Sequence, residues 1–354
     1  MAKSKYSVIG VMSGTSLDGI DLVYATFLFK KVWHFEIIVA ETIEYNYQWR
    51  QILKDLILSS SEELVQIDEK YSIYLSNIIN NFIQKNNIQR IDAICSHGHT
   101  ALHQPEHKLT YQIGNLQEMS SLLKRKVVCD FRVQDVELGG QGAPLVPIGD
   151  KLLFPQYDFC LNLGGFANIS TEEKNSRIAY DVCPVNIVLN HYIKKLGFDY
   201  DDGGRMASKG NLNNELLQEL NALGFYQKKY PKSLGLEWVN RNIFPLIDGF
   251  QLEIKDILTT FVEHIAIQIA SEINKKSKAT VLITGGGVYN KFLVNKLKTH
   301  SKHTIVIPLD AIVEFKEALI FGFLGVLKLR NEVNCLKSVT GASKDHSSGR
   351  IFLP

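Results

Sequence analysis

Three glycine-containing turns, each next to a short β-branched strand, constrain the fold of this chain more than any other feature. They lie at residues 13–20 (SGTSLDGI), 162–168 (NLGGFAN) and 284–290 (TGGGVYN). Glycine lacks a Cβ atom, so such a turn lets the backbone approach a ligand or a neighbouring element closely. The first two turns open the two halves of the chain in the same way. This similarity predicts two related α/β domains that face a cleft.

Length and composition agree with two globular domains. The chain has 354 residues, and a typical domain has roughly 100–200. Hydrophobic residues make up 45% and charged residues 21%, which excludes a disordered, collagen-like or heptad-repeat chain. The 39 Lys+Arg and 37 Asp+Glu leave a net charge of +2. So small a charge gives no reason to expect nucleic acid or an anionic membrane as a partner.

Cysteine usage and the apolar segments bear on the cellular location. The five cysteines are odd in number, contain no C-x-x-C pair and lie mostly in apolar, strand-like runs. This pattern favours reduced core residues of a cytosolic protein over a disulfide framework. The N-terminal segment lacks the apolar stretch of a signal peptide. The longest apolar run, residues 318–327, has ten residues, whereas a membrane span needs roughly 20. We therefore expect a soluble, cytoplasmic protein.

Hydrophobic periodicity predicts strands and helices in both halves. We expect strands at residues 6–12, 21–29, 32–45, 91–96, 126–131, 159–163, 166–170, 177–183, 280–284 and 304–309. We expect helices at residues 62–85, 186–196, 212–223, 255–275 and 315–329. The N-terminal domain is placed at residues 1–140, with residues 338–354 packing against it, and the C-terminal domain at residues 141–337.

The first turn carries groups that suit a phosphate and a magnesium ion. Its backbone N–H groups and the hydroxyls of Thr15 and Ser16 can hold phosphate oxygens. Asp18 and Asp21 could hold a hydrated magnesium ion, which takes few carboxylates and keeps its waters. The segment is neither a Walker loop nor a G-x-G-x-x-G motif, and a plain hairpin turn is an equally good interpretation. Three such turns spread over two domains, however, suit a nucleotide held between them.

Four histidines within residues 97–107 invite a zinc-site interpretation. Gly98 and Pro105 interrupt the segment, so the histidines do not have helical spacing, and no further Cys/His cluster in the sequence supports a metal site. We therefore favour His97 and Thr100 as hydrogen-bonding groups that line a cleft. The other histidines are expected to be loop or surface residues.

Asp181, Glu317 and Arg132 are further candidates for chemistry. Asp181 ends an apolar strand, where a carboxylate can serve as a general base, but it could equally cap the helix that is expected to start near Val185. Glu317 lies at the start of a predicted helix, where a solvated first-turn Glu is the simpler interpretation. Arg132 follows a strand, where it could hold a carboxylate with two hydrogen bonds or form a surface pair.

Taken together, these segments resemble the anhydro-N-acetylmuramic acid kinase family. The matching stretches follow the family's order over nearly the whole chain: GVMSGTSLDGID (10–21), SHGHT (96–100), DFR (130–132), GGQGAPLVP (139–147), NLGGFANIS (162–170), TGGGVYN (284–290), KEAL (316–319) and SVTGAS (338–343). The first and fourth stretches are long and therefore highly specific.

The resemblance implies an α/β fold of two ribonuclease-H-like domains facing a cleft, the architecture of actin-like ATPases and sugar kinases. It implies an enzyme that uses ATP and Mg²⁺ to open 1,6-anhydro-N-acetylmuramic acid with water and to phosphorylate the freed 6-oxygen. The products would be N-acetylmuramate 6-phosphate and ADP, in the peptidoglycan recycling branch of amino sugar metabolism. Family members are commonly homodimers, and neither a nucleic acid nor a membrane partner is implied.

The resemblance also implies roles for individual residues. Asp181 matches the aspartate that activates the water molecule. His97, Thr100, Arg132 and Glu317 fall in motifs that line the sugar site. Asp18 would hold the magnesium ion through water. The ATP-binding motifs contain Gly14, Thr15, Ser16, Leu17, Asp18, Gly19, Ile20, Asp21, Gly164, Gly165, Gly285, Gly286, Gly287 and Asn290.

Three motifs depart from the family's pattern. Around Asp181 the pattern D-T-G-P-G-N is replaced by DVCPVN (181–186), which removes two glycines. Residues 313–316 (VEFK) replace an acidic, Gly-containing stretch, and SHGHT replaces H-G-Q-T. The aspartate and the P-x-N frame remain, which favours a subfamily variant. The alternatives are a kinase for a different anhydro or amino sugar and a catalytically silent ATP- or sugar-binding protein of the same fold.

Overall fold

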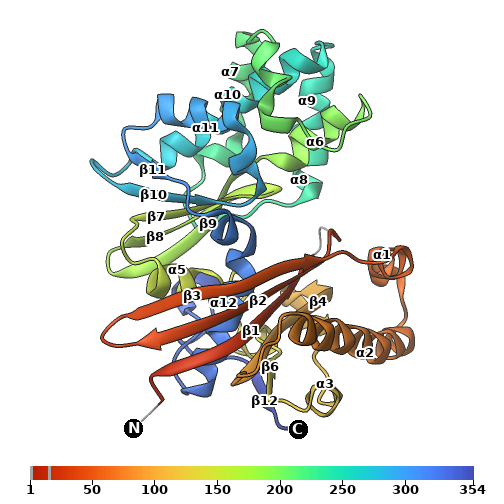
Figure 1. The fold of residues 1–354 in the computed structure, drawn as a ribbon. Helices are drawn as coiled ribbons and strands as arrows, with labels where there is room; N and C mark the ends of the chain where they lie inside the picture. Colours follow the sequence, from red (N-terminus) through yellow and green to blue (C-terminus); the bar gives the residue numbers. More distant parts are fainter. Residues whose placement is uncertain (1–2, 15–16) are drawn as a thin grey trace. The chain divides into compact units, whose positions relative to one another are not determined.

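The chain divides into two units, shown in Figure 1 as a computed structural model that describes residues 3–14 and 17–354. Unit 1 consists of Met1–Phe154 and Phe315–Pro354, and unit 2 consists of Pro155–Glu314. The expected division near residue 140 differs from this one, because residues 141–154 and 315–337 belong to unit 1. Packing explains the difference, since the last long helix lies against the first strand of the chain.

Unit 1 contains a seven-stranded mixed sheet with the order β12-β6-β4-β1-β2-β3, in which β5 pairs with β4. Its strands are β1 (Lys5–Ser13), β2 (Ile20–Phe29), β3 (Trp33–Ile43), β4 (Ala93–Gln104), β5 (Leu109–Ile113), β6 (Val127–Cys129) and β12 (Arg350–Phe352). Its helices are α1 (Tyr47–Lys54), α2 (Ser61–Lys85), α3 (Glu118–Leu123), α4 (Val133–Glu137), α5 (Pro147–Leu153), α13 (Lys337–Thr340) and most of α12 (Asp310–Leu329), with 3₁₀ turns at Leu56–Leu58 and Pro105–His107.

Strand β1 is covered on both faces, because successive side chains of a strand point to opposite sides of the sheet. Ile9 and Val11 lie in the same core cluster as the apolar face of α2. Gly10 lies against α12, where a Cβ atom at this position would overlap the carbonyl oxygen of Ala318. Helix packing therefore explains the glycine that opens the first motif, and no ligand is needed to account for it.

Helix α2 begins at the residue that its capping chemistry selects. The Ser60 hydroxyl accepts a hydrogen bond from the Glu63 N–H at 3.2 Å, and the Glu63 carboxylate accepts one from the Ser60 N–H at 2.7 Å. This reciprocal pair is a capping box, which satisfies two backbone donors at the helix start. The predicted apolar stripe is buried, with Tyr71 and Leu75 fully inaccessible. The helix expected at residues 62–85 is confirmed.

Unit 2 contains a five-stranded mixed sheet with the order β11-β10-β7-β8-β9. Its strands are β7 (Phe159–Leu163), β8 (Phe166–Glu173), β9 (Ser176–Pro184), β10 (Thr280–Thr284) and β11 (Thr304–Val306). Its helices are α6 (Asn186–Lys194), α7 (Asn214–Ala222), α8 (Leu236–Asn242), α9 (Phe244–Gly249), α10 (Ile254–Ile273) and α11 (Lys291–His300), with 3₁₀ turns at Asp202–Gly204, Ala207–Lys209, Gly224–Gln227 and Gly286–Tyr289. One apolar core joins the sheet to α6, α7, α10 and α11.

Five strands of the unit 1 sheet have the same connectivity as the five strands of the unit 2 sheet. In unit 1, β1, β2 and β3 form an antiparallel meander, and β4 pairs in parallel with both β1 and β6. In unit 2, β7, β8 and β9 form the meander, and β10 pairs in parallel with both β7 and β11. The ribonuclease-H-like order is a three-stranded antiparallel meander whose first strand also pairs with a parallel strand, followed by a further parallel strand. The predicted α/β class with two ribonuclease-H-like domains is confirmed.

The histidine-rich segment differs most from the predicted elements. The strand expected to end at residue 96 continues as β4 to Gln104, and it pairs with β5 from His99↔Ile113 to Gln104↔Leu109. The pairing is antiparallel, and the register shifts between Thr100 and Leu102. The pattern of small and polar residues concealed this strand, because its pairing with β5 rather than its own periodicity stabilises it.

The structure tests two predictions made from the composition, namely that the cysteines are core residues and that no segment spans a membrane. All five cysteines are buried and none is part of a disulfide bond, as expected for core residues. No helix in residues 3–14 and 17–354 combines the length and the apolar character needed to cross a bilayer.

Candidate active site

The first glycine-containing turn connects β1 to β2 in unit 1. Thr15 and Ser16, the predicted phosphate ligands, lie outside the described residues. Leu17 has a left-handed backbone conformation with φ of 61°, and its N–H lies 3.4 Å from the carbonyl oxygen of Gly14. Asp18 follows with an exposed side chain. The turn therefore presents a carboxylate to solvent next to backbone held in a conformation that few non-glycine residues adopt.

Packing fixes the end of this turn. Ile20 is fully buried, and a Cβ atom at Gly19 would lie 2.7 Å from the carbonyl oxygen of Ile43. These two residues can therefore offer a nucleotide only their backbone atoms. Asp21, on β2, is only partly buried, and its carboxylate accepts a hydrogen bond from the Thr42 hydroxyl at 2.6 Å.

A buried network that the sequence analysis did not identify holds the start of the turn. The Ser13 hydroxyl lies 2.5 Å from the Tyr45 hydroxyl, 2.8 Å from that of Tyr71 and 2.9 Å from Nδ1 of His99. Burial raises the pKa of Tyr45 to about 12 and lowers the pKa of His99 to about 4. All these groups are therefore neutral near pH 7, and they join β1 to α2 and β4. Only the polar residues within apolar strands could have signalled this network in the sequence.

His97 and Arg132, both predicted to line the sugar site, contact each other. Arg132 donates from Nε to His97 Nε2 at 2.8 Å and from Nη1 to the Gly142 carbonyl at 2.6 Å. His97 Nδ1 donates to the Gly98 carbonyl at 2.9 Å. Burial and the adjacent guanidinium hold the pKa of His97 well below its usual value, so the neutral ring accepts from Arg132. His97 is 3% exposed, and it therefore orients Arg132, whose Nη2 makes no hydrogen bond within the described residues.

Glu317 lies in the second turn of α12, because this helix begins at Asp310 rather than at the predicted residue 315. Its side chain is exposed, and its carboxylate makes no hydrogen bond within the described part of the chain. Desolvation by the surrounding protein raises the pKa of Glu317, and the positive charges of Arg132 and Lys316 partly oppose this shift. Lys316 itself is buried and pairs with Asp150 at 3.1 Å. Glu317 is therefore a water-accessible carboxylate close to a guanidinium, which suits a polar ligand.

Thr100 and the remaining histidines do not form a metal cluster. Thr100 lies on β4 opposite Gln112 of β5. His103 Nδ1 lies 3.1 Å from the Thr110 hydroxyl, and His107 is exposed in a short 3₁₀ turn. Because His97, His99 and His103 each bond to a different partner and His107 is exposed, the structure gives no support to the zinc interpretation of the histidines.

The second glycine-containing turn, formed by Gly164 and Gly165, binds the start of α6. The Gly165 carbonyl accepts hydrogen bonds from the N–H groups of Val185 at 2.8 Å and Ile187 at 3.3 Å, and the Gly164 carbonyl accepts one from Asn186 at 3.3 Å. Helix N-termini leave such donors without intrahelical partners. Gly164 and Gly165, which were predicted to bind ATP, therefore have a structural role that the sequence did not indicate.

The three glycines of the third turn differ in the amount of space around them. A Cβ atom at Gly285 would lie 2.5 Å from the side-chain oxygen of Asn162, and one at Gly287 would lie 2.7 Å from Cβ of Leu163. Gly285 also has φ of 84°. At Gly286 no atom lies within 4 Å of the added Cβ position. The fold itself therefore requires glycine at 285 and 287, whereas the open space at 286 is available to a ligand.

Asn290, at the end of the third turn, has a structural role of its own. Its side-chain oxygen accepts a hydrogen bond from the Leu293 N–H at 3.0 Å and so caps α11. The same side chain packs against Gly204, where a Cβ atom would overlap it. Its oxygen is therefore already engaged, and the amide nitrogen is the part that remains for a nucleotide.

Asp181 lies near the end of β9, opposite Asn168 of β8, where the register of the two strands shifts. Such irregularities often occur beside active sites, because they redirect a side chain. Asp181 Oδ2 accepts hydrogen bonds from the Leu234 N–H at 2.8 Å and the Ser233 hydroxyl at 3.2 Å. Oδ1 makes no hydrogen bond with any described residue. One oxygen is thus held in place while the other is free to accept a proton.

The alternative interpretation of Asp181 as a helix cap is wrong. Helix α6 begins at Asn186, its N-cap residue is Val185, and no side chain caps it. Burial raises the pKa of Asp181, although its two hydrogen bonds act in the opposite direction. A partly buried carboxylate with a raised pKa and a free oxygen has the properties of a general base.

Two ribonuclease-H-like sheets in one chain, with glycine-containing turns after strands of both, define the class of actin-like ATPases and sugar kinases. Within this class, the chain belongs to the anhydro-N-acetylmuramic acid kinase family, because the family model described as "Anhydro-N-acetylmuramic acid kinase" matches residues 6–354. The resemblance inferred from the sequence motifs is confirmed, and so is the prediction of a phosphotransferase that acts on an alcohol group.

Relatives with this family name are similar to the chain over their whole length. The anhydro-N-acetylmuramic acid kinase of Sulfurimonas denitrificans is 31% identical, with 97% of this chain and 98% of the relative covered. That of Mannheimia succiniciproducens is 33% identical, with 99% and 100% covered. That of Haemophilus influenzae is 32% identical, with 97% of each chain covered. The similarity therefore covers both units.

Proposed function

We propose that the protein is an ATP-dependent kinase that opens 1,6-anhydro-N-acetylmuramic acid with water and phosphorylates its 6-oxygen. The products are N-acetylmuramate 6-phosphate and ADP, and the role is cell-wall recycling. Family membership and the names of the relatives support this substrate. The observation that carries the proposed chemistry is Asp181, which combines one anchored oxygen, one free oxygen and a raised pKa.

In the proposed reaction, Asp181 Oδ1 takes a proton from a water molecule as the water oxygen attacks carbon 1 of the sugar. The bond between carbon 1 and the 6-oxygen breaks, and the 6-oxygen forms a bond to the γ-phosphorus of ATP while ADP leaves. One carboxylate suffices, as the base does in inverting glycoside hydrolysis, because the phosphoryl group takes the place of the general acid. The raised pKa strengthens the base, since the carboxylate binds a proton more readily than an exposed Asp does.

The altered loop after Asp181 is compatible with activity. Cys183 and Val185, which replace two glycines of the family's pattern, are fully buried in the apolar core of unit 2. Their side chains fill the core and do not project toward solvent, where a ligand would lie. This placement weakens the argument for a catalytically silent protein.

Arg132 and Glu317 are proposed to bind the sugar. N-acetylmuramic acid carries a carboxylate, and the Nη2 group of Arg132 offers donors of the kind that bind carboxylates. Glu317 can accept hydrogen bonds from sugar hydroxyls. His97 acts through Arg132, and Thr100 contributes its hydroxyl from β4.

ATP is proposed to bind through the turn at residues 14–19 and through the space beside Gly286, with Mg²⁺ as the second cofactor. The fit to magnesium rests on the donor set, because Asp18 is exposed and Asp21 is partly exposed. Carboxylate oxygens with access to water suit an ion that keeps most of its hydration shell, so these residues would hold it through water. Once bound, the ion neutralises charge on the transferred phosphoryl group.

The experiment that tests the proposal combines substrate and product analysis. Purified protein is incubated with ATP and anhydro-N-acetylmuramic acid in heavy-oxygen water, and ADP and the product mass are measured. We expect a product that has gained one phosphate and one water, with the heavy oxygen on carbon 1 and not on the phosphate. Anhydro-N-acetylglucosamine, which lacks the lactyl carboxylate, is the matched control and should react more slowly.

Two outcomes would contradict this function. Equal or faster turnover of the control sugar would favour a kinase for a different anhydro sugar. A lack of ADP release with either sugar, despite measurable ATP binding, would favour the silent binding protein.

A cytoplasmic location and a homodimer complete the proposal. The location follows from the use of ATP as donor. For the dimer, Ile57 and Leu58 are 74% and 81% exposed in the short turn after α1. A second copy of the chain would cover such an apolar surface. Sedimentation equilibrium should give twice the chain mass for the wild type and the chain mass for Leu58→Lys, whereas a monomeric wild type would exclude the dimer.

A further inference from the structure

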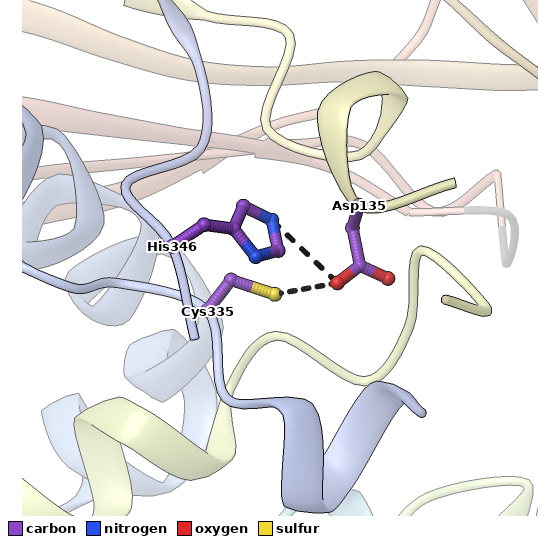
Figure 2. A group of neighbouring side chains, drawn as sticks. All are labelled: Asp135, Cys335 and His346. Carbon is purple, nitrogen blue, oxygen red and sulfur yellow. Dashed lines mark hydrogen bonds and ion pairs between the residues drawn. The ribbon is translucent and has the colours of Figure 1, made fainter. Parts of the chain in front are cut away.

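Three side chains of the types that bind metals meet in unit 1, outside the residues proposed above. Asp135 comes from α4, Cys335 from the segment before α13, and His346 from the segment after it; Figure 2 shows all three pointing toward one another. Asp135 Oδ1 lies 3.0 Å from Cys335 Sγ and 3.6 Å from His346 Nε2. The three ligand atoms lie within 4.8 Å of one another. All three residues are at most 5% exposed.

His346 presents an unsatisfied ring nitrogen to this cluster. Its Nδ1 donates to the Lys344 carbonyl at 3.1 Å, so Nε2 carries a lone pair in the neutral ring. Nε2 is buried and makes no hydrogen bond with a described residue, yet it faces a carboxylate oxygen. Two acceptors in this position are unfavourable unless a proton or a metal ion lies between them. Metal-binding histidines are commonly oriented in this way, by a backbone carbonyl that binds the other ring nitrogen.

We propose that Asp135, Cys335 and His346 bind a zinc ion. A set of one sulfur, one nitrogen and one oxygen ligand suits zinc among the common divalent ions. On binding, the Cys335 thiol releases its proton to solvent. The thiolate and the Asp135 carboxylate then balance the two positive charges, so the buried site is neutral. A fourth ligand would be a water molecule or the Thr340 hydroxyl, which lies 2.7 Å from Asp135 Oδ1.

The metal-free site keeps its thiol proton. The Cys335 thiol donates a hydrogen bond to the Asp135 carboxylate, and this bond requires the proton. A divalent cation reverses this preference, because it stabilises the thiolate directly. Zinc binding is therefore coupled to the loss of one proton and becomes weaker as the pH falls.

The position of the site indicates a structural role. Asp135 Oδ2 accepts a hydrogen bond from the Gly142 N–H at 2.7 Å, and the Gly142 carbonyl accepts one from Arg132. Zinc would thus link the C-terminal segment that carries Cys335 and His346 to the loop at Gly142, which binds Arg132. The burial of all three ligands excludes direct contact with a substrate.

Cobalt provides the test, because Co²⁺ replaces Zn²⁺ and its bonds to thiolate absorb light. The full-length protein is stripped with a chelator and titrated with Co²⁺, and then with Zn²⁺ in competition. We expect one Co²⁺ per chain, a thiolate–cobalt absorption band, and displacement of this band by Zn²⁺. Cys335→Ser should lose the band. Its affinity for Co²⁺ should fall by more than the roughly 10- to 100-fold that follows the removal of an outer-shell partner. His346→Gln should weaken binding but keep the band.

Cys129→Ser is the matched control, because Cys129 is also buried and donates a hydrogen bond to the Asn115 carbonyl at 3.6 Å. This variant should keep both the stoichiometry and the band. The proposal is overturned if the wild type shows no thiolate–cobalt band, or if Cys335→Ser binds Co²⁺ as the wild type does. His346 and Asp135 would then form an imidazolium–carboxylate pair. If Cys335→Ser does not fold, as judged by circular dichroism, the wild-type spectrum and His346→Gln decide the question. None of these outcomes depends on the sugar substrate.

Discussion

The turn after the first strand of each sheet has a different character in the two units. In unit 1 it spans residues 14–19 between β1 and β2 and exposes Asp18. In unit 2 it consists of Gly164 and Gly165, whose carbonyls bind the start of α6. The strands β6-β4-β1-β2-β3 of unit 1 follow the same order as β11-β10-β7-β8-β9 of unit 2, so the two turns occupy the same topological place. The longer turn leaves a carboxylate in solvent, while the shorter one satisfies helix donors.

The paired strands show the same contrast. In unit 1, Asp21 on the second strand lies opposite Thr42 on the third, and the Thr42 hydroxyl binds the carboxylate. In unit 2, the carboxylate lies on the third strand, where Asp181 faces Asn168 and binds Ser233 and Leu234 instead. The two units therefore share a strand order but carry their carboxylates on different strands. We infer that unit 1 supplies carboxylates for a hydrated ion, while unit 2 supplies the base and the open glycine.

The largest effect should come from removing the base in unit 2. Asp181→Asn keeps the size and the hydrogen-bond acceptor but cannot take a proton near pH 7. A positioned base contributes about 10²–10⁴-fold to rate, so we expect a loss of turnover in this range with an unchanged ATP affinity. Steady-state kinetics and calorimetry measure the two quantities. The rate of the wild type should also fall as the pH drops through the raised pKa of Asp181, and the variant should lack this decline.

Asp158→Asn is the control for this substitution. Asp158 belongs to the same unit and accepts a hydrogen bond from the Thr280 N–H at 2.8 Å, but nothing places it near the proposed chemistry. Its turnover should stay within a few-fold of the wild type. Turnover of Asp181→Asn within the same range would exclude Asp181 as the base.

The next effect concerns the sugar-binding groups of unit 1. Glu317→Gln removes a charged acceptor, and a hydrogen bond to a charged group contributes about 1.5–3 kcal/mol. We therefore expect kcat/KM for the sugar to fall roughly 10- to 100-fold, with little change in ATP affinity. Glu332→Gln, which alters an exposed carboxylate paired with Arg330, should change kcat/KM by less than a factor of about 3. Equal behaviour of the two variants would remove Glu317 from the sugar site.

A smaller effect is expected at the open glycine of unit 2. Gly286→Val adds a side chain where the protein has free space, so the fold should tolerate it while the nucleotide loses room. A roughly tenfold weaker ATP affinity corresponds to about 1.4 kcal/mol. Gly249→Val is the control, because a Cβ atom at Gly249 also meets nothing within 4 Å. Calorimetry that gives the same ATP affinity for both variants and the wild type would show that Gly286 does not contact the nucleotide.

The smallest expected effect is on the pH dependence of stability, and it involves one buried histidine in each unit. Burial lowers the pKa of His99 in unit 1 to about 4 and that of His264 in unit 2 to about 3. Both rings are neutral in the folded protein but bind protons below about pH 6.5 once it unfolds. Each histidine therefore contributes stability above that pH, and this contribution is lost progressively as the pH falls toward the folded pKa. Lowering the pH from 8 to 6 should therefore reduce the free energy of unfolding by about 1 kcal/mol for each of the two histidines.

Urea unfolding at pH 8 and pH 6 measures this loss. His99→Gln and His264→Gln should each reduce the difference between the two pH values, and the double variant should reduce it further. If neither substitution changes the difference, these histidines are already protonated in the folded protein or remain neutral after unfolding.

Much of the molecule follows from local sequence patterns. Alternation and three-to-four spacing predicted the two meanders and helices α2, α6, α7, α10 and α12, because a strand or an amphipathic helix records its own period in the chain. The eight motifs were enough to recognise the family. Asp181 could be selected as the base candidate because it ends an apolar strand and matches the family's aspartate, although the following residues depart from the family's pattern.

Other features were decided by tertiary packing. The sequence could not show that α12 belongs with β1, that Gly10 is small because of Ala318, or that Gly286 alone among three glycines faces open space. Nor could it bring Asp135 next to Cys335, which lies 200 positions away along the chain. A local period reports which face of an element is buried, but not which element covers it. The strand order brings distant residues together, so the partners of each side chain were fixed only when the sheets formed.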